Sequence, residues 1–269
     1  MKKIILSAIG LAMFSIVQAQ EQDSIIKDKK TKSTAGLSIG TDGLLRIAIG
    51  VKDTVAKKPE KYPKLSFGFN IEHFDIGLSK YHNGSDFGTP IGYDFLENQA
   101  SKTLNIGVDL FEMGVRFNPN VKIMLAAGID WNLIRLRKDV TILPDRSTLS
   151  ASNDAINYNK NRFSSRYLRI PFYFEYRTNK NDKGKRATIV FGPEVGFLLD
   201  GKVKQKSKET GKVKVKDDYN FEPFRYGANL RVGYKDAGIF FKYYMNDVFA
   251  KNQGPNGYKN MNFGLTFGF

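Results

Sequence analysis

The last nine residues of the chain alternate between apolar side chains and small or polar ones. Met261, Phe263, Leu265, Phe267 and Phe269 share one face of an extended strand, and asparagine, glycine and threonine occupy the other. An uncovered apolar face of this kind promotes aggregation in water, whereas it matches the lipid-facing side of a transmembrane strand. The carboxy-terminal segment therefore predicts an outer-membrane β-barrel in which these five side chains face lipid.

The amino-terminal residues have the pattern of an export signal. Two lysines follow Met1, residues 4–17 are apolar, and Ala19 ends a small-residue cleavage site. A spanning helix needs about 20 apolar residues, and no segment reaches that length, so any crossing of the membrane must use strands. The chain has no cysteine, which excludes disulfides, thiol catalysis and a lipidated cysteine. We expect removal of residues 1–19 as a signal peptide and localisation in the cell outer membrane.

Positive charge dominates the ionisable residues. The formal net charge is +15, and much of it lies between strands, as in residues 202–208. A basic protein can bind nucleic acid, but an exported chain meets anionic glycolipid instead. The expected partners are therefore outer-membrane lipid and glycolipid, and not nucleic acid. The outer-membrane insertion machinery is a further expected partner, with Phe269 as the carboxy-terminal insertion signal.

Eight segments show the two-residue period of strands, and the connections between them alternate long and short. They cover about residues 65–78, 103–117, 121–136, 163–177, 187–199, 221–234, 239–248 and 259–269. Long surface loops alternating with short periplasmic turns are typical of outer-membrane barrels. We predict an all-β fold, an eight-stranded antiparallel up-and-down transmembrane β-barrel that occupies residues 65–269.

Local irregularities refine this prediction. The alternation changes face near His73 and Phe74, which indicates a bulge or an exit from the membrane. Pro171 removes one ladder hydrogen bond from the fourth strand. Lysine and valine alternate on both sides of residues 209–211, which predicts a hairpin that carries two strands beyond the membrane.

Residues 20–64 precede the barrel and are expected to form a periplasmic arm. Residues 20–33 are highly charged and are predicted to be disordered. Residues 37–39 and 45–49 flank Asp42 and Gly43 as a candidate hairpin. Residues 36–51 could instead add two strands to the barrel, and the pattern alone leaves both arrangements open.

A soluble lipocalin-like barrel would share this topology but would place its apolar face inside. Charge favours the membrane arrangement, because acidic and basic side chains share one wall and could pair in a closed lumen. An eight-stranded barrel is just wide enough for side chains to fill. The candidate lumen ion-pair residues are Glu72, Asp109, Glu112, Arg116, Asp130, Arg169, Glu175, Glu194, Arg225, Arg231 and Lys242.

Several blocks resemble the PorT-like, or porin-like, outer-membrane β-barrel family. Residues 166–176 (RYLRIPFYFEY), residues 191–199 (FGPEVGFLL) and the aromatic carboxy-terminus carry the resemblance. Residues 104–117, followed by residues 128–131, are similar to the family's second and third strands. The resemblance extends from about residue 65 to the end and implies an eight-stranded barrel without shared catalytic residues. One relative serves protein secretion across the outer membrane, but a shared fold does not transfer that role.

Catalytic residues are not evident. His82, Ser85 and Asp86 combine the residue types of a hydrolytic triad, but a triad draws its members from separate segments that converge. The lumen carboxylates could bind a cation or transfer protons, yet arginine on the same wall favours ion pairs. No zinc, calcium or phosphate-loop motif occurs, so we expect no metal and no cofactor.

These observations predict a protein without catalytic activity. Its expected role is structural or interactive, through surface loops such as residues 202–216 or through the periplasmic arm, because loops carry function on a rigid scaffold. The alternatives are a small-solute channel and a component of an outer-membrane protein secretion system.

Overall fold

The computed structural model describes residues 61–69, 71–84, 86–181 and 184–269, and the strand backbone of residues 34–39 and 45–50. β1 (Thr34–Ile39) and β2 (Leu45–Gly50) pair with each other in a separate two-stranded sheet. They add no strand to the barrel sheet. The predicted signal peptide and the charged segment 20–33 lie outside the described residues.

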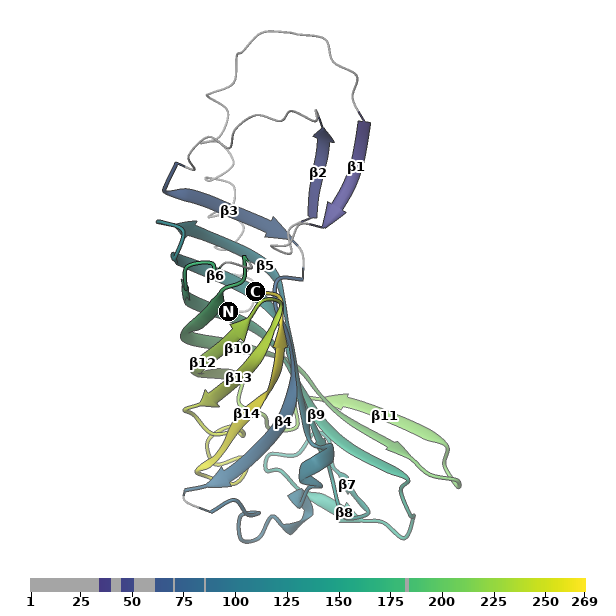
Figure 1. Ribbon diagram of the computed structural model, residues 1–269. Helices are drawn as coiled ribbons and strands as arrows, with labels where there is room; N and C mark the ends of the chain where they lie inside the picture. The colour runs from purple at the N-terminus through teal and green to yellow at the C-terminus, as the bar shows by residue number, and fades with distance from the viewer. Residues whose placement is uncertain (1–33, 40–44, 51–60, 70, 85, 182–183) are drawn as a thin grey trace. The chain divides into compact units, whose positions relative to one another are not determined.

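Eight strands form a closed antiparallel ring (Figure 1). They are β4 (Phe74–Asn83), β5 (Leu104–Arg116), β6 (Val121–Arg135), β9 (Lys160–Arg177), β10 (Ala187–Lys206), β12 (Phe224–Tyr234), β13 (Ala237–Tyr244) and β14 (Tyr258–Phe267). Each ring strand pairs with its neighbours in sequence, and the pairing of β14 with β4 closes the ring. The predicted fold class, an eight-stranded antiparallel barrel, is confirmed.

The pairing register shows that the strands are staggered. Partners followed around the ring from Ala187 return to β10 at Phe197, ten residues further along the same strand. A closed barrel requires such a stagger, with strands tilted to the axis. The short connections lie at one end of the barrel, which we call the turn end, and they are residues 117–120, 178–186 and 235–236. The opposite end carries the long connections and is called the loop end.

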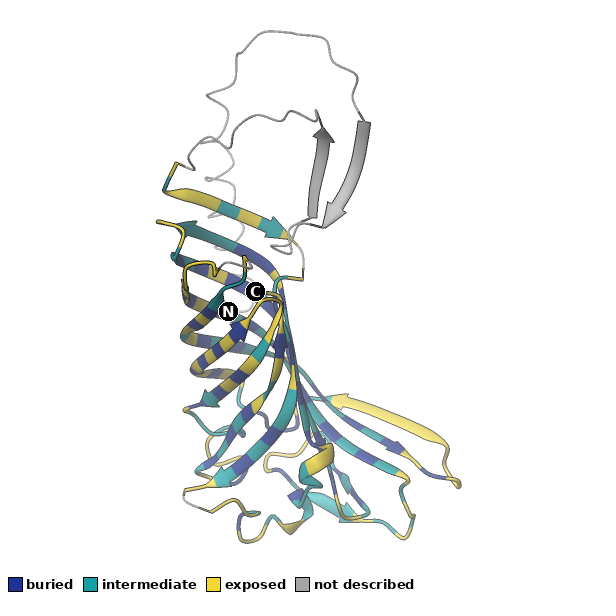
Figure 2. Cartoon of the chain, viewed as in Figure 1, coloured by how far each residue is buried: buried dark blue, intermediate teal, exposed yellow. Residues whose placement is uncertain are grey.

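Exposed and buried residues alternate along the ring strands (Figure 2), and many of the exposed ones are large apolar side chains. In β12 the exposed residues include Phe224 and Leu230, whereas Arg225 and Arg231 are buried inside. The outward apolar run of β6, from Ile123 to Leu133, extends about 33 Å along the strand at 3.3 Å per residue. At the tilt usual for membrane barrels it covers about 25 Å of height, the thickness of their apolar band. The structure thus has the membrane arrangement and not the lipocalin-like one.

The first predicted strand is divided in two. β3 (Lys64–Phe69) pairs with the second half of β5, and β4 pairs with the first half. The register of β5 against β6 shifts between Asp109 and Phe111, at the level of this break. The single strand expected over residues 65–78 is therefore wrong, because regular strand pairing is interrupted between Phe69 and Phe74, although Glu72 and His73 still form backbone hydrogen bonds with Asp109.

Three other features depart from regular ladder pairing. β10 continues to Lys206 and pairs with β11 (Lys212–Asp217), which forms the hairpin expected at residues 202–216. Around Pro171 the ladders of β9 lose partners on both sides. The second long loop contains β7 (Val140–Ile142) and β8 (Ala151–Asn153), a small sheet that the alternation did not predict. The first long loop holds two short 3-10 segments, η2 (Asp94–Leu96) and η3 (Ala100–Lys102).

The carboxy-terminal residue does not continue the lipid-facing row. β14 ends at Phe267, and Gly268 has a positive φ of 96°, which turns the chain away from the strand direction. The Phe269 ring then packs inside the turn end, where a Cβ on Gly233 would collide with it, and its centroid lies 6.0 Å from that of His73. The predicted outward position of Phe269 is therefore wrong, although Met261 to Phe267 keep the expected alternation.

Candidate functional site

Seven of the eight ring strands contribute charged side chains to one buried network in the middle of the lumen. Its four carboxylates and four cations are fully or almost fully buried, and their formal charges balance. The members of this central network are Asp75, Asp109, Asp130, Arg169, Glu194, Arg225, Arg231 and Lys242.

Asp75 on β4 lies at the centre of the network. Arg231 binds its carboxylate with two hydrogen bonds, from Nε to Oδ1 at 3.0 Å and from Nη2 to Oδ2 at 2.8 Å. Arg169 Nη1 and Lys242 Nζ approach Asp75 Oδ2 at 2.9 and 2.8 Å. A bidentate arginine contact fixes the orientation of both groups as well as their charge. Side chains from β9, β12 and β13 thus meet at one carboxylate of β4.

Two further aspartates extend the network along the lumen. Asp109 receives Arg169 Nη2 at 2.7 Å and Arg231 Nη2 at 3.3 Å. Asp130 receives Arg225 Nη2 at 2.6 Å and Lys242 Nζ at 3.1 Å. Of the four cations, Arg169, Arg231 and Lys242 each contact at least two carboxylates, so the pairs cannot be separated into independent salt bridges.

Aromatic rings and amides fill the remaining space around the charges. The Arg225 guanidinium lies between the rings of Tyr167 and Tyr244, 3.9 and 4.1 Å from their centroids. Tyr244 donates to Glu194 Oε1 at 2.7 Å, and Asn229 donates to Glu194 Oε2 at 3.2 Å. Cation–π contacts of this kind gain strength when the ring and the cation are desolvated. The middle of the lumen is therefore filled by mutually bound side chains.

A second group of ion pairs lies nearer the turn end. Lys122 pairs with Glu112, and Glu175 receives both Arg116 Nη2 at 2.8 Å and Arg177 Nε at 2.6 Å. These side chains line a cavity of about 720 Å³, together with Glu72, His73 and Phe269. The eleven lumen residues predicted from sequence thus separate into two groups. Glu72, Glu112, Arg116 and Glu175 are at the turn end, and the other seven belong to the central network.

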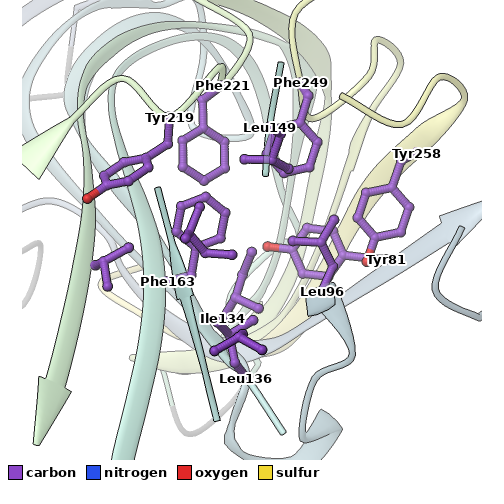
Figure 3. Close-up of a cluster of buried hydrophobic side chains, with 13 residues drawn as sticks. Tyr81, Leu96, Ile134, Leu136, Leu149, Phe163, Tyr219, Phe221, Phe249 and Tyr258 are labelled. Atoms are coloured by element: carbon purple, nitrogen blue, oxygen red, sulfur yellow. The ribbon is translucent and has the colours of Figure 1, made fainter. Parts of the chain in front are cut away.

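The loop end is closed by a third layer, which is apolar (Figure 3). Phe163, Phe221 and Phe249 stack at its centre, with ring centroids 4.7 Å apart for Phe163 and Phe221 and 5.2 Å for Phe221 and Phe249. We call this layer the loop-end cluster. Its buried members are Tyr81, Leu96, Ile134, Leu136, Val140, Ile142, Leu149, Phe163, Val203, Tyr219, Phe221, Phe249 and Tyr258.

The long loops themselves supply much of the loop-end cluster. Leu96 comes from the first long loop, and Val140 and Leu149 come from the second. Burial raises the pKa of Tyr219 to about 12, so its phenol stays protonated at neutral pH. Between this cluster and the central network a void of about 20 Å³ remains, room for about one water.

His82, a member of the candidate hydrolytic triad, contacts its own turn and a tyrosine ring. Its Nδ1 lies 2.8 Å from the carbonyl oxygen of Gly84, and its ring stacks on Tyr243 with centroids 5.8 Å apart. The backbone of Asp86 pairs with that of Asn83 in the same turn. Ser85 lies outside the described residues. Among the described residues, no group of three or more potential ligands could hold a metal ion.

Sequence reasoning missed several residues of the lumen. Asp75 was overlooked because it follows the break in the first strand, although the outward Phe74 and Ile76 on either side imply that it points inward. The alternation does place Lys122 and Arg177 on the inward face, and both form ion pairs, although neither was among the candidate ion-pair residues. The loop-end cluster gave a weaker signal, namely leucine, isoleucine and valine in loops without periodicity.

Comparison with known proteins gives the family. Residues 64–246 match the family described as outer membrane protein beta-barrel domain. No curated protein matches the chain significantly. In the part of the chain that the structure describes, no helix has the length and apolar character needed to cross a membrane. The match covers most of the chain and nearly the whole ring of strands, and the chain therefore belongs to the outer membrane protein beta-barrel family and is an outer-membrane protein.

Proposed function

We propose that this protein is a non-conducting and non-catalytic barrel that acts through its surface loops or its amino-terminal arm. The observation that carries this proposal is the obstruction of the lumen by two successive layers, the central network and the loop-end cluster. A general diffusion pore needs a continuous aqueous path, and the void between these layers holds about one water. In this proposal the cavity at the turn end does not continue through the lumen to the loop end.

The absence of catalysis in this proposal is supported by how the lumen carboxylates are bound. Asp75, Asp109 and Asp130 each contact at least two cations, which leaves none of these three carboxylates poised to accept a proton from a substrate. His82 is held by a turn carbonyl and a tyrosine ring.

A finer assignment within the family is also part of the proposal. Residues 166–176 and 191–199 support a PorT-like, or porin-like, barrel, and they occupy paired segments of β9 and β10. We further propose that residues 1–19 direct export and that the outer-membrane insertion machinery recognises the segment that ends in Phe269.

Conductance in a planar lipid bilayer tests the closed lumen. The purified barrel should give no conductance steps above those of a protein-free bilayer, at either polarity and in 1 M salt. A variant without residues 91–101 and 138–158 provides the comparison, because it removes loop contributions to the loop-end cluster, including β7 and β8, and leaves the eight ring strands intact. Steady discrete steps from the unaltered protein would show an open path and would favour the small-solute channel instead.

Partner capture tests the interaction role. Intact protein and variants without residues 203–215 or without residues 20–60 would be recovered from gently solubilised membranes. We expect a co-purifying protein to be lost with one deletion and kept with the other. Equal recovery of all co-purifying proteins by the three forms would contradict a role for either segment.

A further inference from the structure

The outward surface at the loop end carries a continuous group of cations across four neighbouring strands. Arg135 on β6 is opposite Arg162 on β9, which is opposite Lys204 on β10, which is opposite Lys214 on β11. Residues directly opposite each other in paired strands share one face, with strands about 4.8 Å apart. The register thus forms a row of four cations in which every neighbour has the same charge.

A second row lies beside the first. Lys160 on β9 is opposite Lys206 on β10, which is opposite Lys212 on β11. Lys202 adds one more cation on β10. We call this set the basic belt, and its members are Arg135, Lys160, Arg162, Lys202, Lys204, Lys206, Lys212 and Lys214.

The belt faces away from the lumen. Val203 and Gln205 alternate with its β10 lysines, and both are buried, with Val203 in the loop-end cluster. The lysines between them therefore point outward. β11 is exposed along most of its length, so the side chains of Lys212 and Lys214 reach solvent (Figure 2).

Carboxylates do not neutralise the belt. Asp200 is nearby, but it pairs with Arg166 and lies 3.9 Å from Lys216. No carboxylate of the described residues forms an ion pair with any belt member. Lys204 lies directly between two like charges, opposite Arg162 on one side and opposite Lys214 on the other. Like charges placed directly opposite each other destabilise a sheet, so this arrangement favours occupation by an anion.

The height of the belt indicates which anion reaches it. On β6, Arg135 comes directly after the outward apolar run that ends at Leu133, and on β9 the apolar run ends at Leu168 before Arg166 and Arg162. The outward apolar run of β6 covers about 25 Å of height, which is the height of the apolar band of a membrane barrel. The belt therefore begins where lipid tails end and headgroups start. The loop end of outer-membrane barrels faces outward, so these are headgroups of the outer leaflet.

We propose that the basic belt binds the phosphate groups of an anionic glycolipid in the outer leaflet. The ammonium and guanidinium groups of the belt are arranged in two rows, so they can contact a headgroup that carries more than one phosphate. Arginine can bind a phosphate with two parallel hydrogen bonds. The belt lies on the β6, β9, β10 and β11 side of the barrel, where cations are directly opposite one another across neighbouring strands. This inference deepens the proposed loop interaction by naming a lipid ligand.

Binding of a fluorescent glycolipid with two phosphates, in neutral detergent micelles, tests the proposal. The belt variant carries Lys204→Gln, Lys206→Gln, Lys212→Gln and Lys214→Gln. The charge control carries Lys138→Gln, Lys185→Gln, Lys235→Gln and Lys251→Gln, which removes the same charge outside the belt. A heat-modifiable gel shift shows that each variant is folded.

The belt variant should bind at least about tenfold more weakly than the unaltered protein, because each basic residue near an anionic membrane surface contributes several-fold to binding. The charge control should bind within about twofold, and lysine-to-arginine changes at the four belt positions should preserve binding. The same glycolipid without phosphates should bind weakly to all forms.

Two results would overturn the proposal. Equal binding of the glycolipid by the belt variant and the charge control would show that total charge, and not the belt, attracts lipid. Competition by free pyrophosphate at concentrations comparable to those of the glycolipid would assign the site to a soluble anion instead of a lipid. Neither result bears on bilayer conductance or protein capture, so this inference and the proposed function can fail separately.

Discussion

Asp75→Asn is the substitution that most directly probes the central network. It keeps the shape of the side chain and removes the charge to which three cations are bound, with contacts of 2.8 to 3.0 Å from Arg231, Arg169 and Lys242. The network would then hold one uncompensated positive charge away from water. Removal of one partner from a buried ion pair costs about 3–5 kcal/mol, and we expect the free energy of unfolding to fall by about that amount.

A second substitution separates charge imbalance from loss of shape. Lys242 contacts both Asp75 and Asp130, so Lys242→Met added to Asp75→Asn leaves three carboxylates and three arginines in balance. The double variant should recover part of the loss, with a coupling energy of about 1–3 kcal/mol, as contacting groups in one network usually show. Lys242→Met alone should be destabilising, because it leaves a surplus carboxylate.

Urea unfolding in lipid vesicles or detergent, followed by fluorescence, measures these differences. Trp131 is the only tryptophan and lies in β6, within the ring, so its emission reports exit from the membrane. Asp236→Asn in the exposed β12–β13 turn is the control and should change stability by no more than about 0.5 kcal/mol. The reasoning about a charge-balanced buried network is refuted if Asp75→Asn lowers the free energy of unfolding no more than the control does. It is also refuted if the loss in the double variant equals the sum of the losses in the two single variants.

Two other predictions concern the ends of the lumen. Phe163→Ala should lower the free energy of unfolding by about 3–5 kcal/mol, because it removes a fully buried ring. Limited proteolysis should also cut the long loops of this variant faster than those of the control variant Phe87→Ala, whose substituted side chain is exposed. Phe269→Ala should lower the free energy of unfolding by about 1–2 kcal/mol, since the ring is only partly buried. This loss should appear even when the purified protein refolds into pure lipid. A defect seen only in cells would assign Phe269 to membrane insertion alone.

The ring of strands was accessible to sequence reasoning because side-chain direction in a strand alternates regardless of what the strand pairs with. Met261 to Phe267 show which face is apolar without any knowledge of neighbouring strands. The same alternation did not give the side-chain direction at two places where a strand ends or is interrupted. Gly268 permits a turn that sends the Phe269 ring inward, and the interruption after Phe69 resets the face on which Asp75 lies.

Contacts inside the lumen were less accessible, because they depend on stagger between strands. Asp75 and Arg231 are 156 positions apart, and only the register of the three pairings between β4 and β12, through β14 and β13, places their side chains together. The alternation assigns both to the inner wall, but it gives no height along the barrel axis. The separation of the eleven predicted lumen residues into a central and a turn-end group is therefore a consequence of stagger, not of local pattern.

The loop-end cluster changes how the loops themselves should be understood. Loops of outer-membrane barrels can vary freely where they only cover the rim, but here Leu96, Val140 and Leu149 are buried between strands and rings. Burial of these side chains stabilises the loops against the barrel and closes the lumen in one step. The β10–β11 hairpin shows both roles in neighbouring residues, since Val203 packs into the cluster while Lys202 and Lys204 face outward. The apolar face holds the hairpin in place, so its lysines can be presented in a defined order at the level of the lipid headgroups.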